Sequence, residues 1–295
     1  MSPSKSYGKG LQYLSTDTPI ADIAYLLKRD GGVVIRGLVS SDDLDKTYDE
    51  IKDTLEQDLE WDGEFFPKET RRANSMVARS PTYTKSQLTN PLFQAICAEL
   101  LTTRNTLWWG DKRKESVSRP QVASCVAIEI GPGGRAQPLH CDSYISHRVV
   151  PEISEWDDER DRQREMSIGM MSIPGSHLWA TYRDTPPSLD DVVVPELERG
   201  DAFIMFASVF HGGGSNITTD QRRLVYSTFV VRGYLRQEEN QYLAVPREVV
   251  KSYDRATQEF IGYYISEPAC GFVDQLDLIY VLYPEMLKGA KPKDF

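Results

Sequence analysis

The sequence predicts an α+β fold in which helices surround an antiparallel β-sheet. Residues from about 18 to 110 repeat apolar side chains every three or four positions, as amphipathic helices do. From about residue 121 the pattern changes to the alternation of β-strands, most clearly from Val122 to Ile130. A helical pattern returns at Pro246. Helices and strands that occupy separate stretches of chain are typical of α+β proteins.

The N-terminal stretch contains three predicted helices and one strand. The first helix begins at Ile20 and ends at Gly31, and a short strand from Val33 to Ile35 follows it. Ser40 provides N-cap chemistry for the second helix. Pro91 suits the first position of the third helix.

Two segments of this stretch show no clear periodicity. We expect residues 60–83 to form an ordinary surface loop, although their aromatic and arginine side chains could cover a site. Residues 110–120 are predicted to be a charged connection. The pair Trp108–Trp109 is predicted to lie in the core, because such pairs are more often core residues than ligand cages.

The β part ends in two further predicted strands. Residues 202–206 have the continuous apolar character of a buried strand, and residues 224–231 form a second long one. Pro246 then starts a helix with apolar side chains along one side. No internal repeat or linker is visible, so we expect one domain over residues 1–295. Its helical part covers about 18–110, its β core about 121–235 and its helical tail about 246–290.

The composition argues against several partners and compartments. A formal net charge of -10 is unfavourable for binding nucleic acid or an anionic membrane. The four cysteines are widely separated and form no CxxC pair, which favours reduced thiols inside a cell. No secretory signal and no apolar run of membrane-spanning length occurs. We therefore expect a cytoplasmic protein without a membrane span.

The stretch from Gln137 to Asp142 gives the first indication of chemistry. On an extended chain His140 and Asp142 point to the same face, while Cys141 points away. An imidazole and a carboxylate are two of the three ligands in the facial triad that holds non-haem Fe(II). His211 is the candidate third ligand. It ends a predicted strand directly before three glycines, which leave space beside its imidazole.

Polar residues near these ligands suit a dicarboxylic acid. Arg222 and Arg223 follow His211 by eleven and twelve residues, and a guanidinium can hold a carboxylate bidentately. Successive strand residues face opposite sides, so one of the two arginines faces the site, and the sequence leaves open which. Gln137 can assist at the other end of such an acid. His177, in a loop after Pro-Gly-Ser, is interpreted as a structural histidine that bonds the backbone.

Together these motifs resemble the phytanoyl-CoA dioxygenase superfamily of Fe(II)/2-oxoglutarate-dependent oxygenases. The resemblance rests on Gln137-x-x-His140-x-Asp142, on Ile173 to His177, and on His211-Gly-Gly-Gly with the two arginines. It covers roughly residues 20–240. It implies a double-stranded β-helix, or jelly roll (cupin-like), with the N- and C-terminal helices packed outside. The stretch FPKETRRANSMV is most similar to fungal members that tailor meroterpenoids and related natural products.

The resemblance also implies the chemistry. Fe(II), 2-oxoglutarate and O2 would be required, with ascorbate as reductant in vitro, and no catalytic residue is expected beyond the metal ligands. 2-Oxoglutarate would be decarboxylated to succinate while an unactivated C–H bond of a hydrophobic small molecule is oxidised. The family also suggests a homodimer, or a heterodimer with a homologous oxygenase. The implied site residues are His140, Asp142 and His211 for the metal, Gln137, Arg222 and Arg223 for the cosubstrate, and Arg72, Phe66 and Val230 for the substrate.

The chain departs from the family pattern at one place. Family members usually have an acidic-Asn-Gly-Ala-Thr turn before the Pro-Gly-Ser-His element, and its Thr often helps to bind 2-oxoglutarate. Here Met171 runs almost directly into Ile173 and Pro174. A missing strand would leave a sheet edge unpaired and remove one cosubstrate contact. An alternative therefore stays open, in which the chain is a catalytically impaired subunit that supports an active homologous partner.

Two other enzyme classes lack their motifs in this sequence. The His211-Gly-Gly-Gly stretch resembles the oxyanion-hole loop of serine hydrolases, but no GxSxG elbow occurs. A zinc hydrolase would need an HExxH motif or cysteine ligands, and neither pattern is present.

Overall fold

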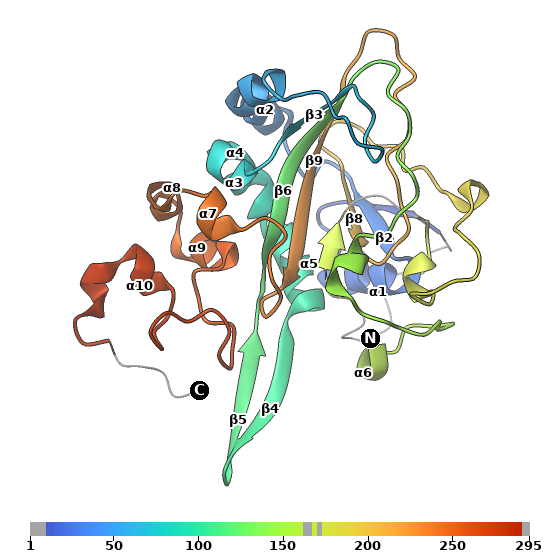
Figure 1. The fold of residues 1–295 in the computed structure, drawn as a ribbon. Coiled ribbons are helices and arrows are strands. Elements are labelled where there is room, and N and C mark those ends of the chain that lie inside the picture. Colours follow the sequence, from blue (N-terminus) through green and yellow to red (C-terminus); the bar gives the residue numbers. More distant parts are fainter. Residues whose placement is uncertain (1–9, 162–166, 170–172, 291–295) are drawn as a thin grey trace.

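The computed structural model describes residues 10–161, 167–169 and 173–290, and its centre is a seven-stranded sheet (Figure 1). Neighbouring strands are antiparallel except β1 and β2, which are parallel. This arrangement confirms the predicted α+β class with a mainly antiparallel sheet. In spatial order the strands are β1 (Gln12–Leu14), β2 (Gly32–Ile35), β8 (Ala202–Phe206), β7 (Ser167–Gly169), β9 (Arg223–Arg232), β6 (Pro120–Ile130) and β3 (Thr70–Ala73).

Helices α2–α4 and α7–α10 lie on one side of the two longest strands, β6 and β9, in Figure 1, and strands β2 and β8, helix α1 and long loops lie on the other side. No helix within the described ranges is long and apolar enough to cross a membrane. The α-helices are α1 (Ile20–Asp30), α2 (Ser41–Glu56), α3 (Met76–Arg79), α4 (Pro81–Tyr83), α5 (Pro91–Leu101), α6 (Asp158–Asp161), α7 (Gln241–Ala244), α8 (Arg247–Ser252), α9 (Arg255–Ile261) and α10 (Ile279–Leu282). A π-helical turn covers Thr84–Leu88, and 3-10 turns cover Asp142–Ser146, Ser176–Leu178, Leu189–Asp191 and Pro284–Leu287.

The ends of the first two helices follow the capping signals in the sequence. At the start of α2 the Oγ of Ser40 accepts the backbone N–H of Asp43 at 3.1 Å. Gly31 ends α1 in the left-handed region, with φ of 84°. A Cβ at Gly31 would lie 2.6 Å from the Nδ1 of His177, so both the backbone and the packing require glycine there. The helices predicted from Ile20 and Ser40 are confirmed.

The main core lies between the helices and the sheet. Ile23 and Leu27 of α1 are completely buried, and so are Val33 and Val34 of β2. Burying each aliphatic side chain of this size contributes about 1.5–3 kcal/mol. This packing fixes β2 and its neighbour β8, which leads directly to one of the candidate ligands.

Three local predictions were wrong. The segment 60–83 is not a plain loop, because Thr70–Ala73 pairs with β6 and two short helices follow. Residues 112–118 form strand β5 (Lys112–Ser118), which pairs along its length with β4 (Thr103–Trp109). The helix expected from Pro246 is two helices, because the chain breaks before Asp254, whose carboxylate caps α9 by accepting the N–H of Thr257 at 2.8 Å.

The β4–β5 hairpin projects from the rest of the protein (Figure 1). Trp108 and Trp109, predicted to be core residues, are 66% and 42% exposed. Their cross-strand partners are Arg113 and Lys112. Charged and aromatic side chains therefore occur on both faces of the hairpin, and neither face offers a continuous apolar surface that could be buried.

Strands β8 and β9 separate beyond the short strand β7. β7 pairs with β8 only at Met205 and Phe206, and with β9 only at Val230 and Val231. Beyond these pairs the facing edges of β8 and β9 have no strand between them among the described residues. A cavity of about 570 Å³ lies there, lined by β8, β9 and α2, and we call it the β8–β9 gap. The predicted loss of a strand near Met171 lies outside the described residues.

Candidate metal centre

Two segments that leave the sheet meet at His140 and His211. The first follows β6 through the turn at Gly131 to Gly134, and the second follows β8. The two backbones form an isolated antiparallel bridge, in which the N–H of each residue donates to the carbonyl of the other at 2.8 Å. Side chains directly opposite in such a pair lie close together on one face. The two imidazole centroids are accordingly 4.2 Å apart.

Asp142 completes a cluster of three candidate ligands. Its Oδ1 lies 3.5 Å from the Nε2 of His140, and its Oδ2 lies 3.3 Å from the Nε2 of His211. The candidate ligand atoms of all three residues lie within 4.8 Å of one another. The extended backbone predicted for this segment ends before Asp142, which instead begins a 3-10 turn. Cys141 points away as predicted, into a small apolar cluster with Ile173 and Phe210.

The surroundings of these side chains suit a bound cation. The Nδ1 of His140 lies 2.9 Å from the carbonyl of Pro138, and the Nδ1 of His211 lies 3.0 Å from that of Val209. Because a carbonyl only accepts, each Nδ1 carries the hydrogen and each Nε2 presents its lone pair. Burial, and then the charge of His211, lower the pKa of His140, which favours the neutral ligand. The buried Oδ2 of Asp142 has no hydrogen-bond partner. A divalent cation among the three side chains would satisfy it, so these residues fit a metal.

Gln137 ties the two ligand-bearing segments together. Its backbone N–H donates to the carbonyl of Gly213 at 2.8 Å, and its Oε1 accepts the N–H of Gly213 at 2.9 Å. A Cβ at Gly213 would lie 2.7 Å from that oxygen, so the contact depends on glycine. The side-chain oxygen of Gln137, predicted to assist the cosubstrate, is thus used within the protein.

The aromatic loop before β3 reaches the centre through Phe65. Its ring packs edge-on against the imidazole of His140, with centroids 4.7 Å apart. Phe66, the predicted substrate contact, lies behind it and packs against Phe65 and Trp61. Arg72 is held beneath the same loop, because its Nε donates to the Oδ2 of Asp58 at 3.1 Å and its guanidinium lies over the ring of Trp61. The aromatic and arginine side chains of this loop suit a cover for a site, but no sequence motif singles out Phe65.

The two consecutive arginines have different partners. Arg222 donates to the buried Oε2 of Glu129 at 3.1 Å. Arg223 donates to the carbonyl oxygens of Gly214 and Ser215, in the segment that follows His211. Burial lowers the pKa of Arg223. Of the two guanidinium groups, that of Arg223 is therefore the one beside the ligand-bearing segment.

Val230 lies away from the candidate centre. It is completely buried and pairs with Val122 in the main core. Thr228, on the same face of β9, bonds the hydroxyl of Tyr83 from α4. At Val230 this face of β9 is buried in the main core, whereas Thr228 and Tyr226 on the same face line the β8–β9 gap.

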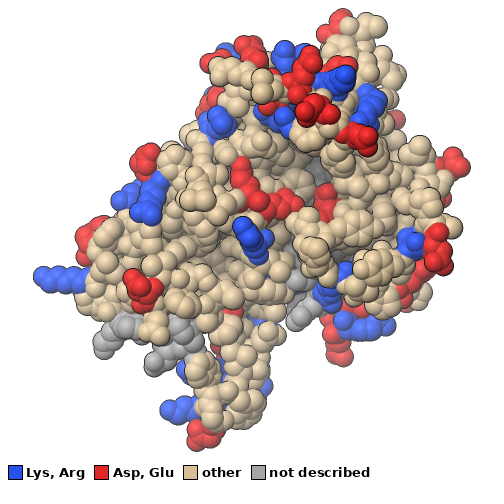
Figure 2. Space-filling model, in the orientation of Figure 1, with Lys and Arg blue, Asp and Glu red and all other residues tan. Residues whose placement is uncertain are grey.

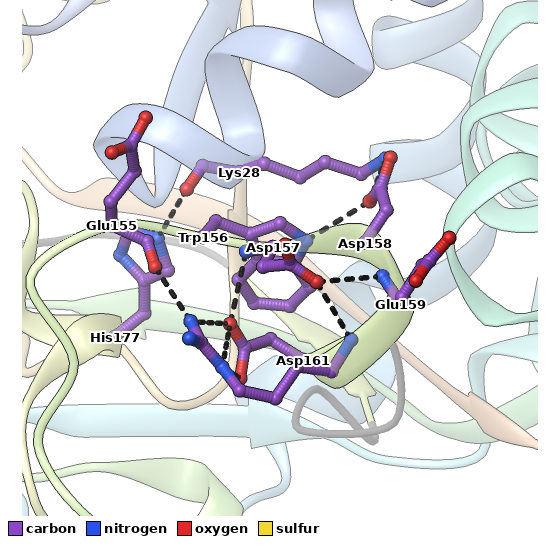
Figure 3. A network of polar contacts seen from close by, with 9 residues as sticks. Lys28, Glu155, Trp156, Asp157, Asp158, Glu159, Asp161 and His177 are labelled. Carbon is purple, nitrogen blue, oxygen red and sulfur yellow. Dashed lines mark hydrogen bonds and ion pairs between the residues drawn. The ribbon is translucent and has the colours of Figure 1, made fainter.

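His177 has the structural role predicted for it (Figure 3). Its Nε2–H donates to the carbonyl of Lys28 in α1 at 2.9 Å. The side chain of Lys28 forms an ion pair with Asp158 at 2.7 Å, and Trp156 stacks on Phe206 of β8. The network fastens the loop around residues 155–161 to α1 and β8.

Glu238 is a candidate site residue that the sequence analysis missed. Its carboxylate accepts a hydrogen bond from the hydroxyl of Ser124. Burial raises the pKa of Glu238, the hydrogen bond from Ser124 lowers it, and the negative charge of Asp142 raises it. Acidic side chains gather around a hollow on this face of the molecule (Figure 2). No motif marks Glu238, because its carboxylate contacts Ser124, which is far away in the sequence.

Comparisons with known proteins agree with this centre. The family model described as Phytanoyl-CoA dioxygenase (PhyH) matches residues 27–224. The chain is 34% identical over 271 residues to the dioxygenase cnsJ of Penicillium expansum, covering 88% of this chain and 80% of that protein. It is 30% identical over 289 residues to the dioxygenase himG of Aspergillus japonicus, covering 90% of this chain and 88% of that protein.

A solved structure supports the fold. The non-haem α-ketoglutarate-dependent epimerase SnoN from nogalamycin biosynthesis superposes with a TM-score of 0.51 at 17% identity, covering 76% of this chain and 88% of that one. At this level of identity the likeness concerns the fold alone. The family match spans more than half of the chain and contains all three candidate ligands. The chain therefore belongs to the phytanoyl-CoA dioxygenase family, and it is a dioxygenase of the class that uses iron and 2-oxoglutarate.

Proposed function

We propose that the protein oxidises an unactivated C–H bond of a bulky hydrophobic natural product while 2-oxoglutarate is converted to succinate. The observation that carries this proposal is the buried Oδ2 of Asp142, which has no hydrogen-bond partner and faces the Nε2 of His211. Bound Fe(II), with 2-oxoglutarate and O2, would supply the oxidising chemistry. His140, Asp142 and His211 would hold the metal.

The other residues would bind and orient the small molecules. Arg223 would pair with the far carboxylate of 2-oxoglutarate, since its guanidinium already lies beside the segment after His211. Phe65 would exclude water from one side of the centre, because its ring packs on His140. Arg222 is less suited to bind the cosubstrate, because its guanidinium is already paired with the buried Glu129.

A meroterpenoid-like substrate in secondary metabolism is the substrate class that we propose. Its support is the similarity of the stretch FPKETRRANSMV to fungal tailoring enzymes, together with the fungal origin of the relatives. We also propose one double-stranded β-helix domain, to which the bridged segments at His140 and His211 belong. The four free thiols support a cytoplasmic location.

Metal binding and succinate formation test the proposal together. Anaerobic calorimetry would measure Fe(II) binding, and succinate would be measured with Fe(II), ascorbate and 2-oxoglutarate. Asp142→Ala should abolish both, whereas Asp190→Ala, at an exposed position in another loop, should preserve both. Fe(II) binding by Asp142→Ala with wild-type affinity would contradict the assigned centre.

The β8–β9 gap supports a second candidate function, that of a subunit that assists an active homologous oxygenase. The facing strand edges and a cavity of about 570 Å³ lie where the family pattern predicts a further strand. The test is 2-oxoglutarate binding by the isolated, iron-loaded chain. A folded protein that binds iron but gains 2-oxoglutarate binding only with the partner would favour this role.

A further inference from the structure

The β4–β5 hairpin, residues 103–118, is an arm on which no other described helix or strand packs extensively. The bonds that anchor it to other described residues include two at its base, where Arg232 donates to the Oγ1 of Thr103 at 2.6 Å and Glu267 accepts the N–H of Val117 at 2.8 Å. A two-stranded hairpin is marginally stable in water when nothing packs on it. The exposed Trp108 and Trp109 near its tip are therefore expected to be covered by something else.

The charge of the arm is opposite to that of the rest of the chain. The arm carries four basic side chains and two acidic ones, so its net charge is +2. The whole chain has a net charge of -10, which leaves -12 outside the arm. Figure 2 shows Lys and Arg side chains on this projection. Such an arm would be attracted to the acidic body of a second copy, whereas that same body would be repelled by an anionic membrane or a nucleic acid.

Helix α2 carries an acidic stripe that matches the arm. Five exposed acidic side chains follow one another at spacings of three, four, four and three residues, which places them on one face of the helix. At 1.5 Å per residue this stripe is about 21 Å long, and strand β4 from Thr103 to Trp109 extends about 20 Å. Two members of the stripe have ion pairs within the chain, Asp45 with Arg199 and Asp49 with Lys52. The members are Asp42, Asp45, Asp49, Asp53 and Glu56.

We propose that two copies of this chain associate about a two-fold axis, with the arm of each lying along the acidic stripe of the other. The arm and α2 lie at opposite ends of the molecule (Figure 1). An antiparallel pair of copies therefore forms both contacts at once and closes the assembly. Because neighbouring strand residues point to opposite faces, one tryptophan of the pair loses its exposure in this contact. Basic side chains of the arm meet Asp53 and Glu56, which have no ion pair among the described residues.

This interface has a consequence for the metal centre. α2 ends at Glu56 and leads directly into the loop whose Phe65 packs on His140. The arm of one copy thus lies beside the segment that begins the aromatic loop of the other. The association itself does not depend on the proposed reaction, and it is measurable without metal or substrate.

Sedimentation velocity of the full chain tests the proposal. The wild type should be a dimer at micromolar concentrations in low salt, and its dissociation constant should rise in 0.5 M salt as exposed charges are screened. An arm variant with Lys112→Glu, Arg113→Glu and Lys114→Glu should be monomeric. A stripe variant with Asp49→Lys, Asp53→Lys and Glu56→Lys should also be monomeric. In each variant the dissociation constant is expected to rise at least about tenfold.

Mixing the two monomeric variants gives the decisive result. In the mixture the acidic arm of the first variant faces the basic stripe of the second, and the basic arm of the second faces the acidic stripe of the first. A heterodimer should therefore form, although neither variant pairs with itself. A control with Lys68→Glu, Lys85→Glu and Lys288→Glu makes the same change of charge at other exposed positions and should stay dimeric. Thermal melting would confirm that all variants are folded.

Four outcomes would overturn the proposal. These are a wild type that is monomeric throughout, an arm variant that stays dimeric, a failure of the mixed variants to pair, and a control variant that also dissociates. A monomeric wild type that sediments with phosphatidylserine vesicles would instead identify an anionic lipid surface as the partner of the arm.

Discussion

The Oδ2 of Asp142 lies 3.3 Å from the Nε2 of His211, although the two residues leave the sheet after different strands. Their approach depends on the backbone bridge between His140 and His211 and on the paired hydrogen bonds between Gln137 and Gly213. The geometry of the centre is thus set by contacts between the two segments as well as by the ligands. This relationship makes the supporting residues testable.

Gln137→Ala should weaken metal binding without removing a ligand. The substitution leaves the N–H of Gly213 without its side-chain acceptor and loosens the register of the two segments. Loss of such support typically costs about 10- to 100-fold in metal affinity. Anaerobic calorimetry with Fe(II) would measure it, and Gln57→Ala, at an exposed position, should leave the affinity unchanged. Equal affinities for the wild type and Gln137→Ala would show that the side chain has no such role.

Arg223→Ala and Arg222→Ala form a matched pair. We expect Arg223→Ala to lower the affinity for 2-oxoglutarate by roughly tenfold or more, because a charge-assisted pair with a carboxylate is lost. Arg222→Ala should have little effect on this affinity, since its guanidinium is paired with Glu129. Titration of the iron-loaded variants with 2-oxoglutarate would measure both. The reverse order of effects would assign the cosubstrate to Arg222.

Arg232→Met should be strongly destabilising. Arg232 is completely buried and donates to the carbonyl of Leu101 at 2.9 Å and to the Oγ1 of Thr103 at 2.6 Å. Methionine can fill much of the space but leaves these acceptors unpaired, at an expected cost of about 2–4 kcal/mol in the free energy of unfolding. Urea denaturation would measure it. Arg247→Met, at an exposed position, should change stability by less than about 0.5 kcal/mol.

Asp201 should make folding depend on pH. Burial disfavours its charge, but the N–H groups of Gly37 and Glu198 and the guanidinium of Arg36 outweigh burial, so the pKa of Asp201 is lowered in the folded protein. The ionised form therefore stabilises the fold above the unfolded pKa of about 3.9, and this contribution is lost as the pH falls through the folded pKa. Asp201→Asn should be less stable than the wild type at pH 7, with the difference shrinking below about pH 4. Urea midpoints across this range would show it, and a difference independent of pH would contradict the assignment.

The three candidate ligands could be predicted from the sequence because each lies in a short motif. His140 and Asp142 are two residues apart, and glycines follow His211 directly. Glu238 could not be found in this way, because its contact with Ser124 joins residues 114 positions apart in the sequence. Such long-range placement leaves no periodic signal.

The fold class was likewise predictable, whereas the hairpin and the last helices were not. Segregated helical and strand patterns predicted the α+β class correctly. Trp108 and Trp109 were predicted to be core residues because they are large and aromatic. The sequence does not reveal that charged residues lie opposite them on the neighbouring strand. The break before Asp254 was hidden because apolar residues on both sides of it continue one helical pattern. The choice between Arg222 and Arg223 required the contacts of each side chain, which a single sequence does not contain.

The β8–β9 gap gives the metal a mechanical role. Among the residues that the structure describes, only the short β7 joins the half of the sheet that contains β8 to the half that contains β6 and β9. His211 follows the first half, while His140 and Asp142 follow the second. A bound ion would therefore cross-link the two halves, and its removal should allow them to open separately. Amide hydrogen exchange in β8 and β9 should then speed up selectively in the metal-free protein, while exchange in β6 next to β3 should change little.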